Sequence, residues 1–413
     1  MPSVNDRIHR AIQDIQQGKM IILMDDPNRE NEGDLIIPAE KITPEIMNFM
    51  IRHGTGIVCL SLTPSQLIKL KLPLMVPTHE NTSVRGTPFT ISIDAREGIT
   101  TGVSAADRTK TILIATHDNV QPEQLVKPGH IFPLQTKPNG VVERQGHTEG
   151  ATDIVRLAGF KPAAVLCEIM NSDGTMAAGE QLTKFAQAHQ LTILAISDIL
   201  TYRLTHENMI VDEITTTIPI EQYGEFTLMV IKEKMFHQEH MILIKQKPRD
   251  DQATVVRIHS SCATGDLFAS KRCNCHTELH YSLKRIHDEG GILIYLNQEG
   301  RGIGLLNKIK AYALQDKGLD TVEANEKLGL PIDARNYSIA ANILRNLHIQ
   351  RIRLITNNPN KISDLKKYGI QEVTREPLPT FLNEHNYHYI KTKKEKLNHL
   401  IQLVHEHGNI NHE

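Results

Sequence analysis

Short apolar runs alternate with amphipathic segments along the first half of the chain. Residues 4–17 carry apolar side chains at helical spacing, which predicts a helix with one buried face. Brief apolar runs predict buried strands at 20–24, 35–37, 57–62, 89–93 and 163–166. Further helices are predicted at 180–188 and 198–206.

A second series of elements begins at 208–232, where a stretch rich in Ile, Thr and Val predicts strands and turns. Strands are then predicted at 255–259, 292–296 and 352–356, and helices at 277–289, 303–317, 336–347 and 391–406. A chain of 413 residues is too long for one ordinary core. We therefore expect an α+β or α/β fold of two mixed-sheet domains, 1–206 and 207–413, each with helices packed on its sheet.

Composition narrows the class of protein. The chain is 40% apolar and 23% charged with a net charge of −2, so no strongly basic surface is expected to attract nucleic acid. Aromatic residues make up only 4%, which leaves few platforms on which bases could stack. Because no apolar run could span a membrane and the N-terminus lacks a signal-peptide core, we expect no membrane partner and a cytoplasmic location. Cys59 and Cys167 stand alone in apolar runs, as buried reduced thiols do.

The polar segment 25–34, DDPNRENEGD, lies between two apolar runs and is expected to be a loop at the end of a strand. In extended backbone the side chains alternate, so Glu30, Glu32 and Asp34 would share one face, with Arg29 and Asn31 on the opposite one. Carboxylate oxygens are preferred ligands of Mg²⁺, which makes this face a candidate metal site. The alternative is a solvated acidic turn, since most charged loops lie at the surface.

Three other polar positions in the first half are suited to chemistry. Within RQGHTEGATD at 144–153, Arg144 could hold a phosphate and His147 could bind metal or transfer protons. Glu168 follows the apolar run AAVLC, and a carboxylate at the end of a buried strand suits general acid or base catalysis. Equally, His147 could be an ordinary structural histidine and Glu168 a salt-bridged residue at the edge of the core.

Several blocks within the first 205 residues resemble 3,4-dihydroxy-2-butanone 4-phosphate synthase and occur in that family's order: RENEGD at 29–34, TTGVSAADR at 100–108, PGHIFPL at 128–134, GHTE at 146–149 and CEIMNSDGTMA at 167–177. The resemblance implies conversion of ribulose 5-phosphate to 3,4-dihydroxy-2-butanone 4-phosphate and formate, with Mg²⁺ or Mn²⁺, in a homodimer. It implies that Glu30 and His147 bind the metal. The implied substrate and catalytic positions are Arg29, Asp34, Arg144, Thr148, Glu168 and His130.

Cysteines are crowded in the second half, where Cys262, Cys273 and Cys275 lie within the stretch HSSCATGDLFASKRCNC. Three thiolates without a fourth sulfur suit a catalytic zinc ion that keeps one position open. A structural zinc is the alternative, because His259 or His276 is near enough in sequence to be a fourth ligand.

This stretch resembles GTP cyclohydrolase II, as do later blocks: NQEGRGIGLLNKIKAYALQD at 297–316, DTVEAN at 320–325, PIDARNY at 331–337 and TNNPNK at 356–361. The resemblance implies zinc-dependent opening of GTP to 2,5-diamino-6-(5-phosphoribosylamino)pyrimidin-4-one, formate and pyrophosphate. Both halves would then serve riboflavin biosynthesis.

The same resemblance assigns roles within the second half. The three cysteines would bind zinc, Asp333 would accept a proton, Arg335 would be the nucleophile toward the α-phosphate, and Tyr312 would assist near the zinc-bound water. The implied substrate contacts are Arg257, Glu299, Gly300, Arg301, Thr321, Thr356 and Lys361. Without the resemblance, 356–361 predicts only a turn, and an arginine near neutral pH predicts only charge stabilisation.

The chain departs from this family around the cysteines. Relatives usually have Glu, Gly, Gln and often a basic residue at four positions that here are Ser261, His276, Glu278 and Asn297. Glu278 replaces a neutral amide by a carboxylate that only accepts hydrogen bonds. The second half is therefore either an active cyclohydrolase or a zinc-binding, catalytically weak domain that supports or regulates the synthase. A zinc-containing nucleic-acid module would need a basic face that this neutral chain lacks.

Overall fold

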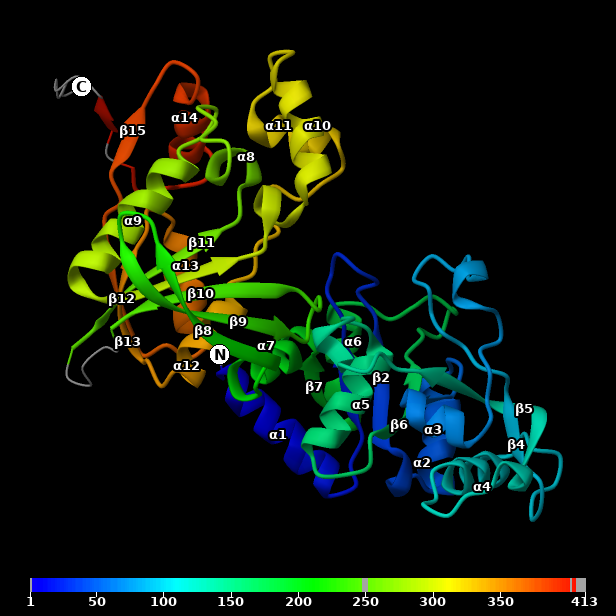
Figure 1. The fold of residues 1–413 in the computed structure, drawn as a ribbon. Helices are drawn as coiled ribbons and strands as arrows, with labels where there is room; N and C mark the ends of the chain where they lie inside the picture. The colour runs from blue at the N-terminus through cyan, green and yellow to red at the C-terminus, as the bar shows by residue number, and fades with distance from the viewer. Residues whose placement is uncertain (1, 247–251, 402, 406–413) are drawn as a thin grey trace. The chain divides into compact units, whose positions relative to one another are not determined.

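The structure, a computed structural model, describes residues 2–246, 252–401 and 403–405. The chain divides into two compact units, Met1–Arg203 and Leu204–Glu413. Within the described residues, each unit is built on one seven-stranded mixed sheet with helices packed on it (Figure 1). The predicted fold class is therefore confirmed.

The sheet of the first unit has the strand order β4–β5–β3–β6–β2–β1–β7. Its strands are β1 (Ile21–Met24), β2 (Gly33–Pro38), β3 (Cys59–Leu62), β4 (Ile93–Ala95), β5 (Leu125–Gln135), β6 (Ala163–Glu168) and β7 (Thr192–Ala195). Because β2 runs antiparallel to both β1 and β6, the loop between β1 and β2 meets the end of β6 at one end of the sheet.

Helices cover both faces of this sheet. One face packs against α1 (Val4–Gln16), α5 (His147–Leu157) and α7 (Ile196–His206). The other packs against α2 (Pro44–Phe49), α3 (Pro64–Lys69), α4 (Ala105–Ala115) and α6 (Glu180–His189). Helix α1 begins where the Ser3 hydroxyl accepts a hydrogen bond from the Asp6 N–H, and it buries Ile8 and Ile15 completely. Each buried isoleucine contributes roughly 1.5–3 kcal/mol of transfer free energy.

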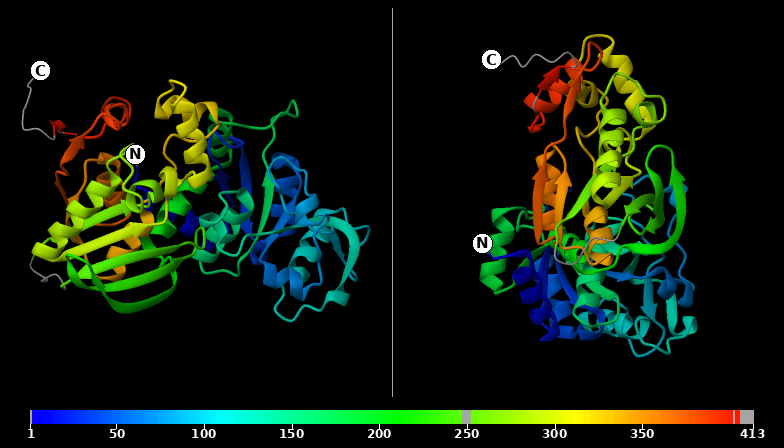
Figure 2. Two further views of the ribbon diagram at one scale, coloured as in Figure 1. Left: turned by 45° about the horizontal axis from the view of Figure 1, so that its top comes forward. Right: turned by 60° about the vertical axis from the view of Figure 1, so that its left-hand side comes forward.

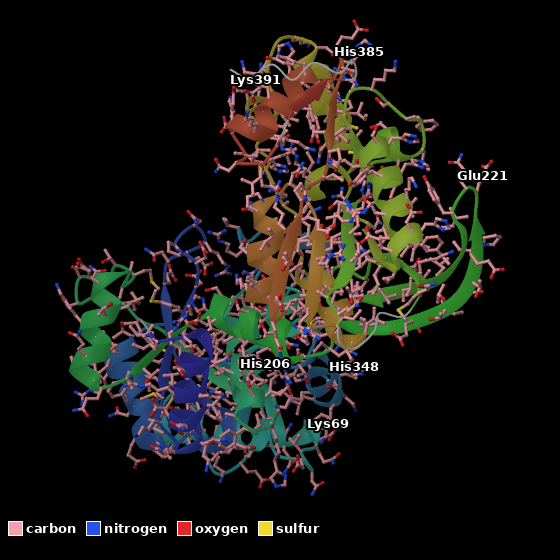
Figure 3. The ribbon with its side chains drawn as sticks, turned by 90° about the vertical axis from the view of Figure 1, so that its left-hand side faces the viewer. Lys69, His206, Glu221, His348, His385 and Lys391 are labelled. Atoms are coloured by element: carbon pink, nitrogen blue, oxygen red, sulfur yellow. The ribbon has the colours of Figure 1, made fainter. Side chains whose placement is uncertain are left out.

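The sheet of the second unit has the strand order β14–β13–β11–β12–β10–β9–β8. Its strands are β8 (Ile210–Ile220), β9 (Gly224–Glu233), β10 (Glu239–Lys245), β11 (Thr254–Ser260), β12 (Gly291–Leu296), β13 (Arg351–Ile355) and β14 (Glu372–Glu376). Strands β8 and β9 form a long hairpin with Glu221 at its tip (Figures 2 and 3). A separate two-stranded sheet pairs β15 (Thr380–Leu382) with β16 (Leu403–His405).

Strands β11 to β14 run parallel, so their carboxyl ends meet at one edge, where open α/β sheets usually bind ligands. The cysteine stretch follows β11, the glycine-rich loop follows β12, and the segment 356–361 follows β13. The helices of the unit are α8 (Ala263–Asp266), α9 (Cys275–Glu289), α10 (Leu305–Gln315), α11 (Thr321–Lys327), α12 (Ser338–Asn346), α13 (Pro359–Lys367) and α14 (Tyr387–Glu395). Figure 1 shows α8, α10, α11 and α14 beyond this edge.

Two predicted elements are wrong in extent. The strand predicted at 89–93 begins only at Ile93. The Thr90 N–H bonds to the Pro133 carbonyl and the Ile91 N–H to the Pro73 carbonyl, so these residues do not pair with one partner strand. The helix predicted at 391–406 spans Tyr387–Glu395. It ends before Asn398, whose φ of 55° is left-handed, and residues 403–405 form a strand. Residues 402 and 406 lie outside the described residues. Within those residues, no helix has both the length and the apolar character needed to cross a membrane.

Candidate active sites

The loop between β1 and β2 is organised around the carboxylate of Asp25, which the sequence reasoning did not single out. This carboxylate is fully buried and accepts hydrogen bonds from the Glu30 N–H at 3.1 Å, the Glu32 N–H at 2.9 Å and Arg29 Nη1 at 2.8 Å. Burial alone would raise the pKa of Asp25, but the hydrogen bonds from Arg29 and Glu32 hold it below its ordinary value. Asp25 therefore fixes the path of the loop as an ionised acceptor.

The same loop corrects the expected alternation of side chains. Residues 27–30 form a turn, and Asn31 has a φ of 57°, so the backbone is not extended there. Arg29, expected on the face opposite Glu30, instead bonds to the Glu30 carboxylate. The turn thus places a guanidinium and a carboxylate side by side at the end of the sheet.

Glu30 and His147 lie together, although 117 positions separate them in the sequence. His147 Nδ1 is 3.8 Å from Glu30 Oε2, and possible ligand atoms of Asp25, Glu30 and His147 all lie within 4.8 Å of one another. His147 is the first residue of α5; it is buried, and its Nε2 has no hydrogen-bond partner. Burial lowers the pKa of this imidazole, which favours the neutral form that binds metals. These residues fit a divalent metal ion.

Two carboxyl groups oppose each other beside this group. Asp34 on β2 is the direct partner of Glu168 on β6. Glu168 Oε2 accepts a hydrogen bond of 2.8 Å from the Ile57 N–H, whereas Asp34 Oδ1 has no partner. Burial and then Asp34 raise the pKa of Glu168 to about 7, and burial and then Glu32 raise the pKa of Asp34 well above its usual range. The pair is therefore suited to exchanging protons near neutral pH.

The other predicted positions of the first unit are placed as follows. Arg144 Nη1 bonds to the buried Glu149 at 2.7 Å, and Thr148 is buried in the first turn of α5. His130, on β5, bonds through Nδ1 to Asp94 at 2.7 Å and has a half-exposed side chain. Among the described residues, no hydrogen bond or ion pair joins His130 to Glu30 or His147.

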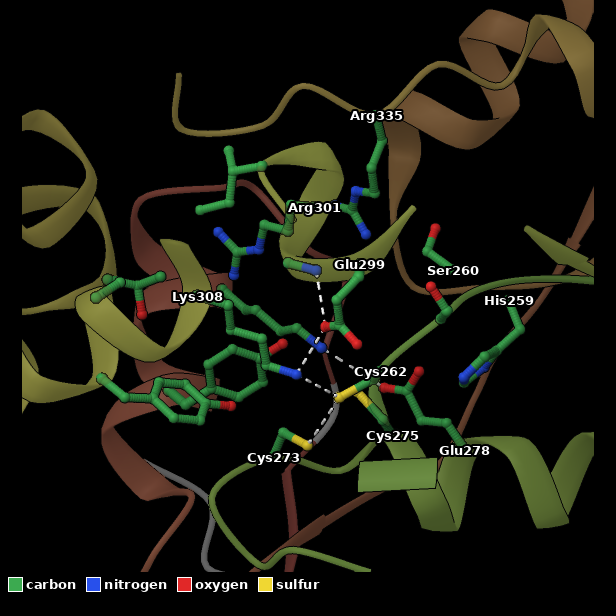
Figure 4. Close-up of a pocket in the computed structure, with 18 of the residues that line it drawn as sticks. His259, Ser260, Cys262, Cys273, Cys275, Glu278, Glu299, Arg301, Lys308 and Arg335 are labelled. Atoms are coloured by element: carbon green, nitrogen blue, oxygen red, sulfur yellow. Dashed lines mark hydrogen bonds and ion pairs between the residues drawn. The ribbon is translucent and has the colours of Figure 1, made fainter. Parts of the chain in front are cut away.

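The three cysteines of the second unit converge on one point. Cys262 Sγ and Cys273 Sγ are 3.8 Å apart, and all three sulfurs lie within 4.8 Å of one another (Figure 4). A tetrahedral zinc ion with bonds of about 2.3 Å separates two sulfur ligands by about 3.8 Å, so the thiols fit zinc. Gly265 makes this possible, because a Cβ there would lie 2.9 Å from the Cys275 Cβ and 3.0 Å from Cys273 Sγ.

Neither candidate for a fourth protein ligand joins this group. His259 Nε2 is 3.0 Å from Asp266 Oδ1, and the other Asp266 oxygen accepts hydrogen bonds from the Cys262 N–H and the Tyr295 hydroxyl. His276 packs its ring against His280 at 4.3 Å. Among the described residues, the potential metal-binding group here consists of the three cysteines alone. This arrangement favours an open metal position over a closed one.

Charged side chains surround the thiols. Lys308 Nζ lies 3.1 Å from Cys262 Sγ and 2.8 Å from Glu299 Oε1, and Glu299 Oε2 accepts a hydrogen bond from the Ala263 N–H (Figure 4). Hydrogen bonds from Cys273 and Cys275, and then Lys308, hold the pKa of Cys262 well below its ordinary value. The neighbouring thiols and Lys308 therefore favour the thiolate form of Cys262.

A pocket collects most of the predicted residues of this unit. Those lining it are Arg257, Cys262, Cys273, Cys275, Glu299, Gly300, Arg301, Tyr312, Thr321, Arg335 and Lys361. Asp333 lies beside the pocket and accepts two hydrogen bonds from Arg335, from Nε to Oδ1 at 2.8 Å and from Nη2 to Oδ2 at 2.5 Å. Thr356 is not in the lining; it is buried, and its hydroxyl accepts a hydrogen bond from the Asn358 N–H. Lys308, Glu278, Tyr389 and Lys393 also line the pocket and were not predicted as site residues.

The glycine-rich loop joins two parts of this pocket. Gly302 has a φ of 90°, and a Cβ there would lie 2.9 Å from the Ala334 carbonyl oxygen. The Ala334 N–H in turn bonds to the Arg301 carbonyl at 2.9 Å. Only glycine permits this close approach of the two backbone segments, which brings Arg301 near Arg335. The glycine-rich loop therefore has a role in backbone packing, in addition to any role in binding a ligand.

The positions that depart from the family pattern have distinct surroundings. Glu278 is bonded to Arg257 Nη2 at 2.6 Å, and despite burial, Lys393 and then Arg257 lower its pKa to about 2. Ser261 lines the pocket, and its hydroxyl has no partner. The Asn297 N–H bonds to His240 Nδ1 at 3.0 Å. Relative to the family pattern, Glu278 thus adds a negative charge to the pocket lining, whereas Ser261 removes one.

Comparison with known proteins divides the chain in the same way. A family model of 3,4-dihydroxy-2-butanone 4-phosphate synthase matches residues 9–202, and one of GTP cyclohydrolase II matches residues 211–377. The riboflavin biosynthesis protein RibBA of Aquifex aeolicus is 48% identical over 397 residues, which cover 95% of this chain and 97% of that protein. The RibBA protein of Cytophaga hutchinsonii is 48% identical over 398 residues, or 96% of this chain and 98% of that protein.

One solved structure is similar across both units. It is RibBX from A. baumannii, described as a two-domain 3,4-dihydroxy-2-butanone 4-phosphate synthase. The TM-score is 0.66 with 35% sequence identity, and the match covers 90% of this chain and all of that one.

Proposed function

Because the chain belongs to the family of bifunctional riboflavin biosynthesis proteins, with a 3,4-dihydroxy-2-butanone 4-phosphate synthase domain and a GTP cyclohydrolase II domain, we propose how its residues divide the two reactions. We assign the lyase to residues 1–206 and the hydrolase to residues 207–413. The substrates are ribulose 5-phosphate and GTP, respectively.

The lyase site is supported by one observation: the loop between β1 and β2 meets α5 and the end of β6, so that Glu30, His147, Asp34 and Glu168 gather at one end of the sheet. Glu30 and His147 would hold Mg²⁺ or Mn²⁺, which when bound stabilises negative charge on the substrate oxygens. Glu168, with its pKa of about 7, would remove a proton as general base, and Asp34 would return one. Arg29, Arg144 and Thr148 would bind the sugar phosphate.

Purified protein should release formate from ribulose 5-phosphate when Mg²⁺ is present. A Glu30→Ala variant should lose that activity and bind Mn²⁺ more weakly in equilibrium dialysis. Normal turnover by this variant would contradict the metal-site assignment.

The hydrolase site is supported by the convergence of the three thiols, Tyr312 and Arg335 on one pocket. Cys262, Cys273 and Cys275 would hold Zn²⁺, which when bound supplies an activated water for attack on the purine. Arg335 would act at the α-phosphate, and Asp333 would take its proton; the hydrogen bonds from Arg335 Nε and Nη2 to the Asp333 carboxylate support this role. Glu299, Gly300, Arg301, Thr321, Thr356, Arg257 and Lys361 are proposed substrate contacts.

Zinc-loaded protein should convert GTP to the diaminopyrimidine and pyrophosphate. A Cys273→Ser variant is the control, because it removes a sulfur ligand. Product formation no higher than this control would favour the second candidate, a zinc-binding domain that supports the synthase. The ion pair between Glu278 and Arg257 is the observation that favours that candidate, since it occupies a predicted substrate contact.

We also propose a cytoplasmic homodimer that has no nucleic-acid or membrane partner. His130 pairs with Asp94, and in the described residues no hydrogen bond or ion pair joins it to Glu30, which supports a site completed by a partner subunit. Sedimentation of the purified chain tests this assembly, and a monomer at micromolar concentration would contradict it.

A further inference from the structure

Two residues of the pocket come from outside the segment matched by the cyclohydrolase family. That match ends at residue 377, whereas Tyr389 and Lys393 lie on α14 and line the pocket with the thiols. Helix α14 therefore belongs to the binding site in space, although it lies beyond the matched segment in sequence.

Helix α14 is held in place without Lys393. Lys396, just after the helix, pairs with Asp320 and lies 3.5 Å from Glu323, both at the start of α11. Further along, the Leu400 N–H bonds to the Asn357 carbonyl at 2.8 Å, and the Leu400 carbonyl accepts a hydrogen bond of 2.8 Å from Arg375. Because these contacts hold the segment that follows the helix, the position of α14 does not depend on the Lys393 side chain alone.

The ammonium group of Lys393 is buried but only loosely paired. Its side chain is 12% exposed, and Nζ lies 3.7 Å from Glu278 Oε1, 3.3 Å from Asn274 Oδ1 and 4.7 Å from the centre of the Tyr389 ring. The stronger contact of Glu278 goes to Arg257, at 2.6 Å. Lys393 thus shares the Glu278 carboxylate with Arg257, which lies closer to it.

Basic side chains outnumber carboxylates in the lining of the pocket. Its cationic lining residues are Arg257, Arg301, Lys308, Arg335, Lys361 and Lys393, and its carboxylates are those of Glu278 and Glu299. Burial, and then Arg257 and Arg335, lower the pKa of Lys361 well below its ordinary value. Burial, and then Lys393 and Arg335, lower the pKa of His399 to about 3. The neighbouring cations thus add to the effect of burial on both pKa values, and a bound polyanion would offset their contribution.

We propose that Lys393 is a substrate-contacting residue that binds a phosphate group of the polyphosphate ligand, and that Glu278 pairs with its ammonium until that ligand arrives. The identity of the ligand in this inference rests on the proposed hydrolase function. The charge of the site does not depend on that function. Phosphate oxygens are strong acceptors for an ammonium group, and a buried charge-assisted hydrogen bond is worth more than an exposed one.

Variants at the two positions distinguish binding from a purely structural ion pair. Lys393→Gln removes an attractive charge and should weaken binding of a polyphosphate about tenfold or more. Glu278→Gln keeps the shape but removes a repulsive charge, so it should tighten binding. Lys391→Gln is the matched control, because Lys391 lies on the outer surface of the same helix (Figure 3). It should change the dissociation constant less than twofold.

The probe is inorganic tripolyphosphate, titrated calorimetrically into the zinc-loaded full-length chain, with zinc content and thermal midpoint measured for every variant. Opposite shifts for Lys393→Gln and Glu278→Gln support the proposal. It is overturned if both variants weaken binding, if Lys393→Gln binds as the wild type does, or if the wild type does not bind the probe. Should Lys393→Gln unfold, Lys393→Arg replaces it: retained binding supports the charge assignment, and lost binding with an intact fold overturns it.

A parallel GTP assay separates this inference from the proposed function. If the wild type leaves GTP intact but binds tripolyphosphate through Lys393, the hydrolase function fails and the inference stands. If the wild type opens GTP while Lys393→Gln changes neither KM nor probe binding, the function stands and the inference fails.

Discussion

Asp34 and Glu168 are directly opposed residues of adjacent antiparallel strands, so two carboxyl side chains share one face of a buried sheet. Opposed like charges destabilise a strand pair, and burial adds a desolvation cost to each ionised form. The arrangement therefore favours a protonated carboxyl group in the pair, which a reaction that moves protons between carbon and oxygen atoms can use.

The lyase activity should rise as the pH passes through about 7, because Glu168 acts as a base only when deprotonated and its pKa is about 7. Formate release from ribulose 5-phosphate, measured as kcat/KM between pH 5.5 and 8.5, checks this. Glu168→Gln should lose activity by a factor of about 100 or more across the whole range. A wild-type profile that is flat between pH 6 and 8 would remove Glu168 as the base.

Replacing Asp34 by asparagine should change stability in a pH-dependent way. The pKa of Asp34 is raised in the folded protein, so the contribution of this carboxyl to stability is greatest at low pH and is lost as the pH rises toward its folded value. Relative to the wild type, metal-free Asp34→Asn should therefore become more stable as the pH rises from 5 to 8. Urea unfolding of both proteins at the two pH values measures the difference. A relative loss at the higher pH would show that Asp34 is ionised in the fold.

Asp25→Asn should disorganise the loop between β1 and β2 while leaving the core intact. An amide accepts hydrogen bonds through one oxygen only, so it cannot replace both carboxylate oxygens that bind the Glu30 and Glu32 N–H groups and Arg29. We expect lyase activity to fall about tenfold or more, with a stability loss of about 1–3 kcal/mol. Asp26→Asn is the control, because Asp26 is exposed and its carboxylate accepts hydrogen bonds from the nearby Asn28. Equal effects of both variants would argue against a special role for Asp25.

Gly265→Ala should impair zinc binding by the second unit. The added methyl group would lie 3.0 Å from Cys273 Sγ and 3.1 Å from Cys262 Sγ, too close unless the sulfurs move apart. Zinc content measured by atomic absorption should fall below one ion per chain after dialysis against a weak chelator, and GTP turnover should fall with it. Lyase activity should be unchanged and serves as the internal control. Full zinc retention would show that the cysteine loops can relax.

Sequence patterns predicted the parts of this molecule that rest on local regularity. The spacing of Ile8 and Ile15 predicted α1 because burial of one helical face follows a fixed period. His147 also begins a helix, but polar residues surround it in the sequence, so no apolar period revealed α5.

Contacts between distant residues were not predictable in the same way. The turn that ends at Glu30 depends on hydrogen bonds to Asp25 and on the left-handed Asn31, and an assumption of extended backbone missed both. From the sequence, Glu278 was recognisable only as a departure from the family pattern. Its two ion-pair partners, Arg257 on β11 and Lys393 on α14, are distant in sequence and are brought together by the fold. A charged segment such as α14 looks like a solvated surface helix, because its role comes from docking over a pocket that other strands build.

The spacing of the three thiols also makes the second unit vulnerable to oxidants. Cys262 Sγ and Cys273 Sγ need to approach by only about 2 Å to reach the length of a disulfide bond, and Cys262 is already disposed to be a thiolate. Peroxide acting on metal-depleted protein would therefore link these sulfurs and prevent reloading with zinc. Burial raises the pKa of Cys167 to about 12 and that of Cys59 well above its usual range, so the first unit has no comparable weakness in its described residues. Under the proposed assignment, oxidation would then stop the hydrolase reaction while the lyase reaction continued.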